Sequence, residues 1–369
     1  MSRGRKRPTP RPDAATELTS VSLTDLPPWP ELPDLEQRLA ELVSQIPSGR
    51  VATYGALALA LGSIKASPWI ATVLDRARFA DLPTHRVVAA TGQVRRGHPG
   101  QGLSPAEKLL AEGVLFRRDQ VLLEHSLWQP VAVSPPLQPL SAYQSACADW
   151  LRQQTPPGAK LRSPIAPGTS PAPSAYRHVA GLDVSYARSD LAVAACVVID
   201  RLDPQSPPRV FLARCPVAFP YLSTFLSFRE IPAMRAALQS AREAGEQIDL
   251  LLVDGTGGLH PKQVGIATQL GLLERLPSVG VTKSRLTGQW NPRLLSPSNP
   301  QPIRLEDLVA GYALQTVKGK TLYVSPGYQM QPEESRDIVQ SLLTETPLPR
   351  PIYWADRLSR QHARQLQRG

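Results

Sequence analysis

Cysteine is scarce in this 369-residue chain. Its three cysteines, Cys147, Cys196 and Cys215, form no Cys-x-x-Cys pair. A set this small and unpaired argues against a disulfide framework and against a structural zinc site. The composition therefore favours a protein that keeps its thiols reduced.

Long apolar runs are missing as well. No stretch approaches the roughly 20 apolar residues of a membrane-spanning helix. The N-terminal Met1–Arg7 is basic and lacks the apolar core of a secretory signal. We therefore expect a cytoplasmic protein without membrane spans, associated with the nucleoid in a bacterial or archaeal cell.

Acidic residues are fewer than basic ones. The chain has 31 Asp and Glu against 41 Lys and Arg, which gives a net charge of +10. Excess positive charge favours a polyanionic partner. Nucleic acid is the first candidate, and an anionic membrane surface is the weaker one.

Proline-rich stretches divide the chain into four regions. Residues 1–31 are expected to be a disordered basic tail, which either adds attraction to phosphate or only solubilises the chain. Residues 32–130 form a first domain. Residues 131–177 form a proline-rich linker whose single helix, 141–154, belongs to the next domain. Residues 178–369 form that second domain.

The first domain has the pattern of a compact helical module. Apolar residues follow a helix period from Leu35 to Ile46, and shorter helices are expected over Tyr54–Leu61 and Ser67–Phe79. The short turn at Gly62 between the last two is typical of a helix-turn-helix. Residues 83–96 then predict a strand and a turn.

The second domain begins with strands and continues with alternating strands and helices. The expected strands are Val179–Ala187, Leu191–Ile199 and Val210–Val217, with a later one over Ile248–Val253. An antiparallel start followed by alternation predicts a mixed α/β sheet.

Three carboxylates occupy notable positions in this second domain. Asp183 interrupts the apolar run Val179–Tyr186, Glu230 opens a helical stretch, and Asp254 ends the run Ile248–Asp254. Each has an ordinary explanation when taken alone, such as a turn or the first turn of a helix. An aspartate in a buried strand is costly unless a cation neutralises it. Three that converge would form an oxygen-rich Mg²⁺ site suited to phosphodiester hydrolysis.

Seven short segments of this half follow one another in an order found in one nuclease family. They are Ala180–Val184, Phe219–Leu222, Phe225–Glu230, Val253–Gly255, His260–Pro261, Gly280–Lys283 and Trp354–Asp356. Together they resemble endonuclease V, a family that acts on deaminated nucleic acids. The resemblance implies a ribonuclease-H-like fold and a metal-dependent endonuclease.

The resemblance also implies roles for single residues. Asp183, Glu230 and Asp254 match the metal-binding carboxylates, with Mg²⁺ as the cofactor and Mn²⁺ as a possible substitute. Lys283 matches a lysine near the scissile phosphate, where its charge would offset developing negative charge. His260 either contacts phosphate and the metal shell, or makes a structural hydrogen bond at a helix start.

A loop and one departure from the family pattern complete the second domain. Pro220, Tyr221 and Leu222 match a wedge loop that enters the duplex beside a lesion, because an aromatic tip can replace lost base stacking. The alternative for Tyr221 is a core aromatic. Tyr328 follows Ser-Pro-Gly where the family usually has His, and a phenol is a poor base at neutral pH.

The first domain carries a second set of motifs. They are Ile46–Gly55, Pro83–Val88, Thr91–Val94 and Glu107–Gly113. These resemble the DNA-binding domain of O6-alkylguanine-DNA alkyltransferases, within a winged helix-turn-helix-like fold. Thr84 occupies the place of the acceptor cysteine, and a hydroxyl has no low-pKa thiolate form. We therefore expect an alkyltransferase-like domain that binds DNA without alkyl transfer.

The same resemblance suggests DNA contacts in the first domain. Tyr54 matches a residue that presses on the phosphate beside a flipped nucleotide, with helix packing as the alternative. Trp69 either stacks in the void left by a flipped base or packs in the interior. Thr84 and Arg86 line the same expected surface, although a structural role is favoured for Arg86 and His85.

Three functions remain open at this level. The first is a DNA repair endonuclease that hydrolyses the bond 3′ to a deaminated base, with lesion-containing duplex DNA as its partner. The second is a non-catalytic lesion sensor that recruits other factors. The third is an endoribonuclease specific for inosine in RNA, because a fold alone does not specify the substrate.

Overall fold

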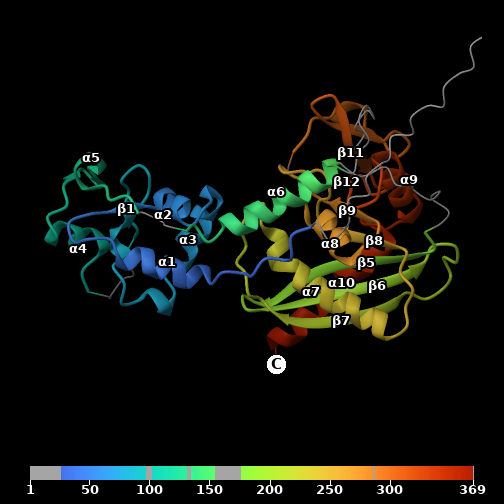
Figure 1. Ribbon diagram of the computed structural model, residues 1–369, viewed down its shortest axis with the longest axis horizontal. Coiled ribbons are helices and arrows are strands. Elements are labelled where there is room, and N and C mark those ends of the chain that lie inside the picture. Colours follow the sequence, from blue (N-terminus) through green and yellow to red (C-terminus); the bar gives the residue numbers. More distant parts are fainter. Residues whose placement is uncertain (1–25, 97–101, 131–133, 154–175, 286, 369) are drawn as a thin grey trace, which may run out of the picture.

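The computed structural model describes residues 26–96, 102–130, 134–153, 176–285 and 287–368, arranged as a smaller N-terminal and a larger C-terminal lobe (Figure 1). Most of the expected tail and much of the expected linker lie outside the described residues. Among the described residues, no helix is both long enough and apolar enough to cross a membrane.

The smaller lobe is mainly helical, as the sequence predicts. Its helices are α1 (Leu35–Ser44), α2 (Tyr54–Ala60), α3 (Ser67–Val73), α4 (Pro105–Ala111) and α5 (Leu123–Ser126), and its short strands are β1 (Ala52–Thr53), β2 (Val87–Val88), β3 (Phe116–Arg117) and β4 (Gln120–Val121). The Thr53 side chain caps α2 by accepting from the Ala56 N–H. Helix α3 is shorter than expected, and a separate 3-10 turn covers Ala77–Phe79.

The larger lobe is built on one mixed sheet of eight strands. In spatial order these are β10 (Gln301–Leu305), β11 (Leu308–Gln315), β12 (Thr321–Pro326), β9 (Ser278–Thr282), β8 (Leu250–Asp254), β5 (His178–Arg188), β6 (Leu191–Asp200) and β7 (Arg209–Pro216). Strands β5, β8 and β9 are parallel, and the remaining pairs are antiparallel. The mixed α/β sheet predicted from the sequence is therefore confirmed.

Helices cover both faces of this sheet (Figure 1). Helices α7 (Leu226–Glu243) and α8 (Ile266–Glu274) pack with Ala180 and Leu182 on one face. Helices α9 (Pro332–Leu342) and α10 (Arg350–Arg368) pack with Val179 on the other. Because side chains alternate along a strand, Asp183 is expected on the α10 face together with Val179.

The register of β5 against β8 brings two acidic residues together. Leu182 pairs with Val253 in this parallel ladder, so Asp183 and Asp254 follow at the same end of adjacent strands. The next strand, β9, pairs with β8 so that Val281 lies opposite Asp254. The sheet therefore presents both aspartates at one edge.

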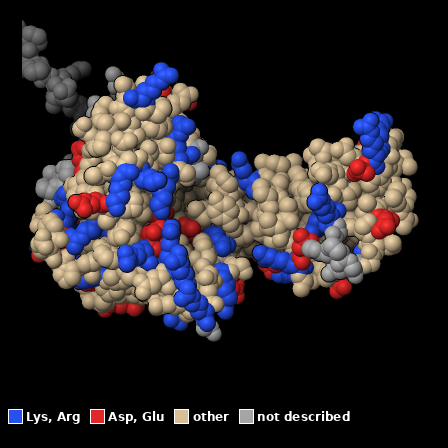
Figure 2. Space-filling model, turned by 180° about the vertical axis from the view of Figure 1, so that it is seen from behind, with Lys and Arg blue, Asp and Glu red and all other residues tan. Residues whose placement is uncertain are grey.

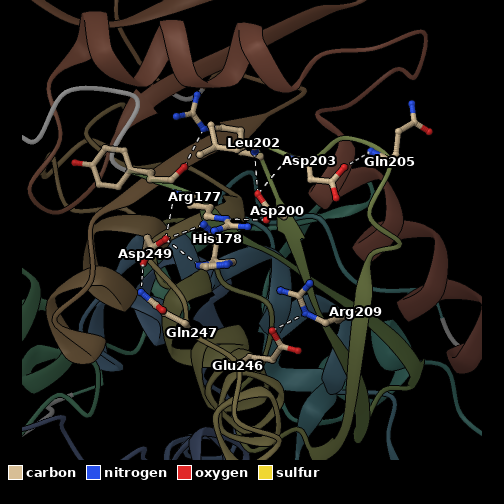
Figure 3. A network of polar contacts seen from close by, with 12 residues as sticks. Arg177, His178, Asp200, Leu202, Asp203, Gln205, Arg209, Glu246, Gln247 and Asp249 are labelled. Carbon is tan, nitrogen blue, oxygen red and sulfur yellow. Dashed lines mark hydrogen bonds and ion pairs between the residues drawn. The ribbon is translucent and has the colours of Figure 1, made fainter.

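A polar network ties the opposite ends of these strands together (Figure 3). The Asp249 carboxylate accepts from the backbone N–H groups of Arg177 and His178, at 3.1 and 2.7 Å. The Arg177 guanidinium also donates to Asp200 at the end of β6, at 2.8 Å. These bonds join the start of β5 to β6 and β8, which supports the register that aligns the aspartates.

The two lobes share a buried apolar cluster. Trp29 lies 5.5 Å from the Tyr143 ring and 5.1 Å from the Phe228 ring, measured between ring centroids. Tyr143 belongs to α6 (Gln138–Gln153), the helix expected at 141–154, and Phe228 belongs to α7. Leu26 and Trp29, which fall within the tail predicted over 1–31, pack against this cluster; residues 1–25 of that prediction lie outside the described residues.

Candidate metal centre

Three aspartates converge where β5, β8 and α10 meet. Asp183, Asp254 and Asp356 each offer one carboxylate oxygen, and these atoms all lie within 4.8 Å of one another. The sequence pattern predicted the first two as metal ligands but not Asp356, although that residue closes the matching segment Trp354–Asp356. A set made only of carboxylate oxygens suits a hard divalent cation.

Helix α10 supplies a second group to this centre. The buried Ser359 hydroxyl donates to Asp183 Oδ2 at 2.6 Å and lies 2.8 Å from the Ser185 hydroxyl. Asp356 and Ser359 are three residues apart, so they face the same strand from one side of the helix. Ser359 therefore orients the Asp183 carboxylate.

The three carboxylates repel one another in the absence of a cation. Burial raises the pKa of Asp183 to about 7, and the charges of Asp254 and Asp356 add to this rise. Burial also raises the pKa of Asp254, although the nearby Lys283 ammonium opposes the shift. A bound divalent cation would remove this repulsion, so the donor set and its electrostatics fit a metal site.

The raised Asp183 pKa predicts that, in EDTA, the contribution of this residue to the free energy of unfolding falls as the pH rises. An unfolded aspartate titrates near ~3.9, whereas folded Asp183 titrates at about 7. Below the first value both states are protonated; between the two only the unfolded state ionises, which favours unfolding. We expect the melting temperature of Asp183→Asn to match the wild type at about pH 4 and to exceed it increasingly up to about pH 8. A difference that is constant with pH would contradict the shift.

Glu230 approaches from α7, on the other face of the sheet. Its Oε1 accepts from the Tyr186 hydroxyl at 3.1 Å, and burial raises its pKa to about 8. The charges of Asp183 and Asp254 contribute to this rise, so Glu230 lies close enough to interact with them. The sequence predicted Glu230 as the third metal-binding carboxylate. In the structure, Asp356 takes that place in the group of three, and Glu230 lies outside the group.

Lys283, which the family resemblance placed near a scissile phosphate, lies beside the carboxylates. Its ammonium is 3.3 Å from Asp356 Oδ1 and 3.7 Å from Asp254 Oδ2. Arg360 also pairs with Asp356, at 2.7 Å. Half of the Lys283 side chain is exposed, so the ammonium is accessible to a substrate phosphate.

His260 is buried and neutral. Its Nε2 lies 3.3 Å from the Thr224 carbonyl, and its Nδ1 accepts from the Lys262 N–H at 3.2 Å. Burial lowers its pKa to about 4. Both ring nitrogens are thus engaged with backbone, which favours the structural alternative: His260 holds Thr224, which has a positive φ of 72°.

The expected wedge loop has one exposed tip. Tyr221 is 66% exposed, whereas its neighbour Leu222 is 1% exposed and belongs to the apolar cluster shared by the lobes. Pro220 is half-buried. The exposed ring favours the wedge over the core aromatic for Tyr221, and Leu222 anchors the loop instead of extending its tip.

Tyr328 packs inside the larger lobe. It is 4% exposed, its ring centroid is 6.4 Å from that of Trp150, and its hydroxyl accepts from Gln329 at 3.2 Å. Among the described residues, the structure records no hydrogen bond between Tyr328 and the three aspartates. The departure from the family pattern therefore changes packing near α8, not the carboxylate set.

The smaller lobe keeps a polar cluster around the position of Thr84. Glu112 accepts from Arg86 Nη2 and from His85 Nε2, both at 2.8 Å, and Arg86 Nη1 donates to the Ile46 carbonyl at 2.6 Å. These bonds occupy the Arg86 guanidinium inside the lobe, which favours its structural role. Thr84 and His85 line a surface hollow.

Trp69 is less accessible than a base-stacking residue needs, and Tyr54, expected to press on a phosphate, is partly buried. Trp69 is 7% exposed and packs in the shared cluster, and Tyr54 packs against the same cluster. Burial raises the pKa of Tyr54, although the charge of Arg95 opposes this. The packing alternative is thus favoured for Trp69, whose edge lines a hollow between the lobes.

Comparison with known proteins identifies the family to which this chain belongs. Residues 160–357, more than half of the chain, match the sequence family Endonuclease V. The chain belongs to the endonuclease V family. Residues 34–114 match the DNA-binding domain of 6-O-methylguanine DNA methyltransferase. This endonuclease V is therefore a nuclease of DNA phosphodiester bonds with an alkyltransferase-like DNA-binding domain.

Curated relatives and solved structures agree with this assignment. The chain is 38% identical to endonuclease V of Ignicoccus hospitalis over 53% of this chain and 87% of that one, and 39% identical to that of Roseiflexus castenholzii over 50% and 82%. Human ENDOV is 29% identical with a TM-score of 0.52, covering 62% of this chain and 98% of its own. The Ciona intestinalis enzyme, at 25% identity and a TM-score of 0.51 over 62% and 98%, was crystallised with DNA containing an inosine followed by a ribo-adenosine.

Proposed function

We propose that this endonuclease V nicks DNA on the 3′ side of deoxyinosine, in the cytoplasm, with Mg²⁺ as its metal and Mn²⁺ as a possible substitute. The convergence of Asp183, Asp254 and Asp356 beside Lys283 carries the proposal. The inosine-containing DNA bound by the Ciona relative supports the choice of lesion.

Each residue of the centre has a role in this proposal. Asp183 and Asp254 hold the metal with Asp356 as a third ligand, and Glu230 completes the site and positions water. When bound, the metal supplies Lewis-acid polarisation of the phosphate and lowers the pKa of water. Lys283 neutralises charge that develops on the phosphate, and the exposed Tyr221 ring fills the stack beside the lesion.

The smaller lobe binds DNA in this proposal and transfers no alkyl group. Thr84 lines its hollow where a reactive thiol would be required, and none of the three cysteines falls within residues 34–114. Competition between an O6-alkylguanine duplex and an undamaged duplex measures its selectivity. Equal affinities would reduce this lobe to a general DNA-binding module.

Nicking of an end-labelled duplex with a single deoxyinosine tests the function directly. The reactions contain Mg²⁺, Mn²⁺ or EDTA, and the control duplex has deoxyguanosine at the same place. We expect metal-dependent cleavage one nucleotide beyond the lesion, and none of the control. Tight binding without cleavage in either metal would favour the non-catalytic sensor instead.

An inosine-specific ribonuclease is the second candidate. The ribo-adenosine that follows inosine in the DNA bound by the Ciona relative favours this alternative. Placing either adenosine or deoxyadenosine after the inosine distinguishes the two candidates. Faster cleavage of the deoxyadenosine substrate supports the DNA nuclease, and cleavage of the ribonucleotide substrate alone supports the ribonuclease.

A further inference from the structure

Four hollows in the described surface share lining residues, or have lining residues in contact with one another, across both lobes. The first contains Thr84 in the smaller lobe, and the second contains Trp69 and Tyr221 between the lobes. The third contains Asp183, and the fourth contains Asp356. An arginine stands at each junction between consecutive hollows.

Arg76 joins the first two hollows, because its side chain lines both of them. It pairs with Glu36 of α1 and is 47% exposed, so its guanidinium remains accessible to a ligand. The hollow around Thr84 therefore adjoins the one beside the Tyr221 tip.

Arg229 joins the second hollow to the third. It lines the second, and its guanidinium carbon lies 4.2 Å from the centroid of the Tyr186 ring, which lines the third. Arg229 donates to the Phe219 carbonyl at 2.6 Å, and its buried Nε has no hydrogen-bond partner among the described residues.

Arg360 and Arg364 line both the third and the fourth hollow. They belong to a row on α10 that includes Arg357 and Arg368, spaced three or four residues apart and hence on one helix face. This row lines one hollow with Asp356, and α10 covers the sheet face opposite to α7, the helix that carries Arg229. Figure 2 shows acidic residues in the hollowed centre of the larger lobe with Lys and Arg around them, and further basic residues on the same face of the smaller lobe.

We propose that the four hollows form a single DNA path, so that both lobes hold one continuous duplex during cleavage. A polyanionic backbone requires a cation at intervals, and guanidinium groups bind phosphate well. The path passes the wedge tip and then the carboxylates, which is the order needed if the lesion lies between the two. The alternative is a tether, in which the smaller lobe binds a separate stretch of DNA. The proposal rests on the proposed nuclease function.

Full-length protein and duplexes of different flank lengths test this path. Each duplex carries one deoxyinosine, and the flank on one side is lengthened while the other stays fixed. We expect the affinity to rise when one flank, and only that one, is made longer than the stretch of DNA that the larger lobe covers. Arg76→Ala should remove this gain. Arg38→Ala is the matched control, because Arg38 also pairs with a glutamate of α1 and is 49% exposed but lines none of the four hollows.

Salt dependence provides the second readout. Loss of one phosphate contact makes the negative slope of log affinity against log salt shallower by about 0.9. For Arg76→Ala on the long duplex, the ratio of affinities at 50 and 200 mM salt should therefore shrink by a factor of about 3.5. Arg38→Ala should leave it unchanged. Equal gains on both sides, or an Arg76→Ala variant that keeps the gain, would overturn the single path. Failure of the wild type to nick any duplex would instead contradict the proposed function.

Discussion

Asp254→Asn should lower the nicking rate by roughly three orders of magnitude while leaving DNA binding intact. The substitution keeps the size of the side chain but removes one negative charge from a cluster whose oxygens lie within 4.8 Å of one another. Metal-assisted polarisation is worth several kcal/mol, and each 1.36 kcal/mol corresponds to about a tenfold change in rate. Single-turnover nicking and a gel-shift titration measure the two properties separately.

The binding result discriminates a metal ligand from a residue that folds the site. Removing a negative charge beside a polyanion reduces repulsion, so affinity should stay equal or rise. Asp307→Asn is a suitable control, because Asp307 precedes β11 and is not one of the three aspartates. Nicking by Asp254→Asn at the wild-type rate would exclude Asp254 from the metal centre.

Gly181→Ala should have the second largest effect, through the position of α10. A Cβ at Gly181 would lie 2.4 Å from the Pro351 carbonyl carbon and 2.7 Å from the Ile352 nitrogen. Backbone cannot yield as a flexible side chain does, so the helix must move away from β5. Overpacking of this kind costs about 1–3 kcal/mol, and a displacement of ~1 Å at a catalytic group can cost about a hundredfold in rate.

Thermal unfolding and nicking at saturating DNA measure the two consequences of Gly181→Ala. Helix α10 carries both Asp356 and Ser359, so its displacement should disturb the centre even where the protein stays folded. Gly55→Ala is the control, because a Cβ there meets the end of the Ile64 side chain at 3.4 Å and the Thr53 hydroxyl at 3.9 Å, and no described backbone atom outside its own helix is that close. Full activity of Gly181→Ala together with a lowered melting temperature would show that the centre tolerates movement of the helix.

The sequence pattern predicted the part of the centre that depends on strands. Asp183 interrupts one apolar strand-like run and Asp254 ends another, and carboxylates at such positions indicated a shared site. The structure brings these two together and adds Lys283 from the next strand.

The rest of the centre depends on packing between distant elements, which periodicity does not encode. Asp356 lies in a helix rich in arginine, where an acidic residue has an ordinary surface explanation. Its role is visible only after α10 packs against β5 through the close approach at Gly181. The burial of Leu222 beside the exposed Tyr221 is likewise decided by the shared apolar cluster and not by the local sequence.

Trp29 attaches the smaller lobe at a second point. The chain passes Trp29 before it enters the smaller lobe, and it leaves that lobe through α6. Both Trp29 and α6 contact Phe228 of α7 in the larger lobe. Two attachment points restrict the motion of the smaller lobe, because bending at one junction is resisted by the contacts at the other. A deletion that removes residues 1–130 would also withdraw the Trp29 ring and leave Tyr143 and Phe228 partly facing water. The nuclease half should therefore be prepared with residues 26–33 attached, so that Trp29 still covers this apolar cluster.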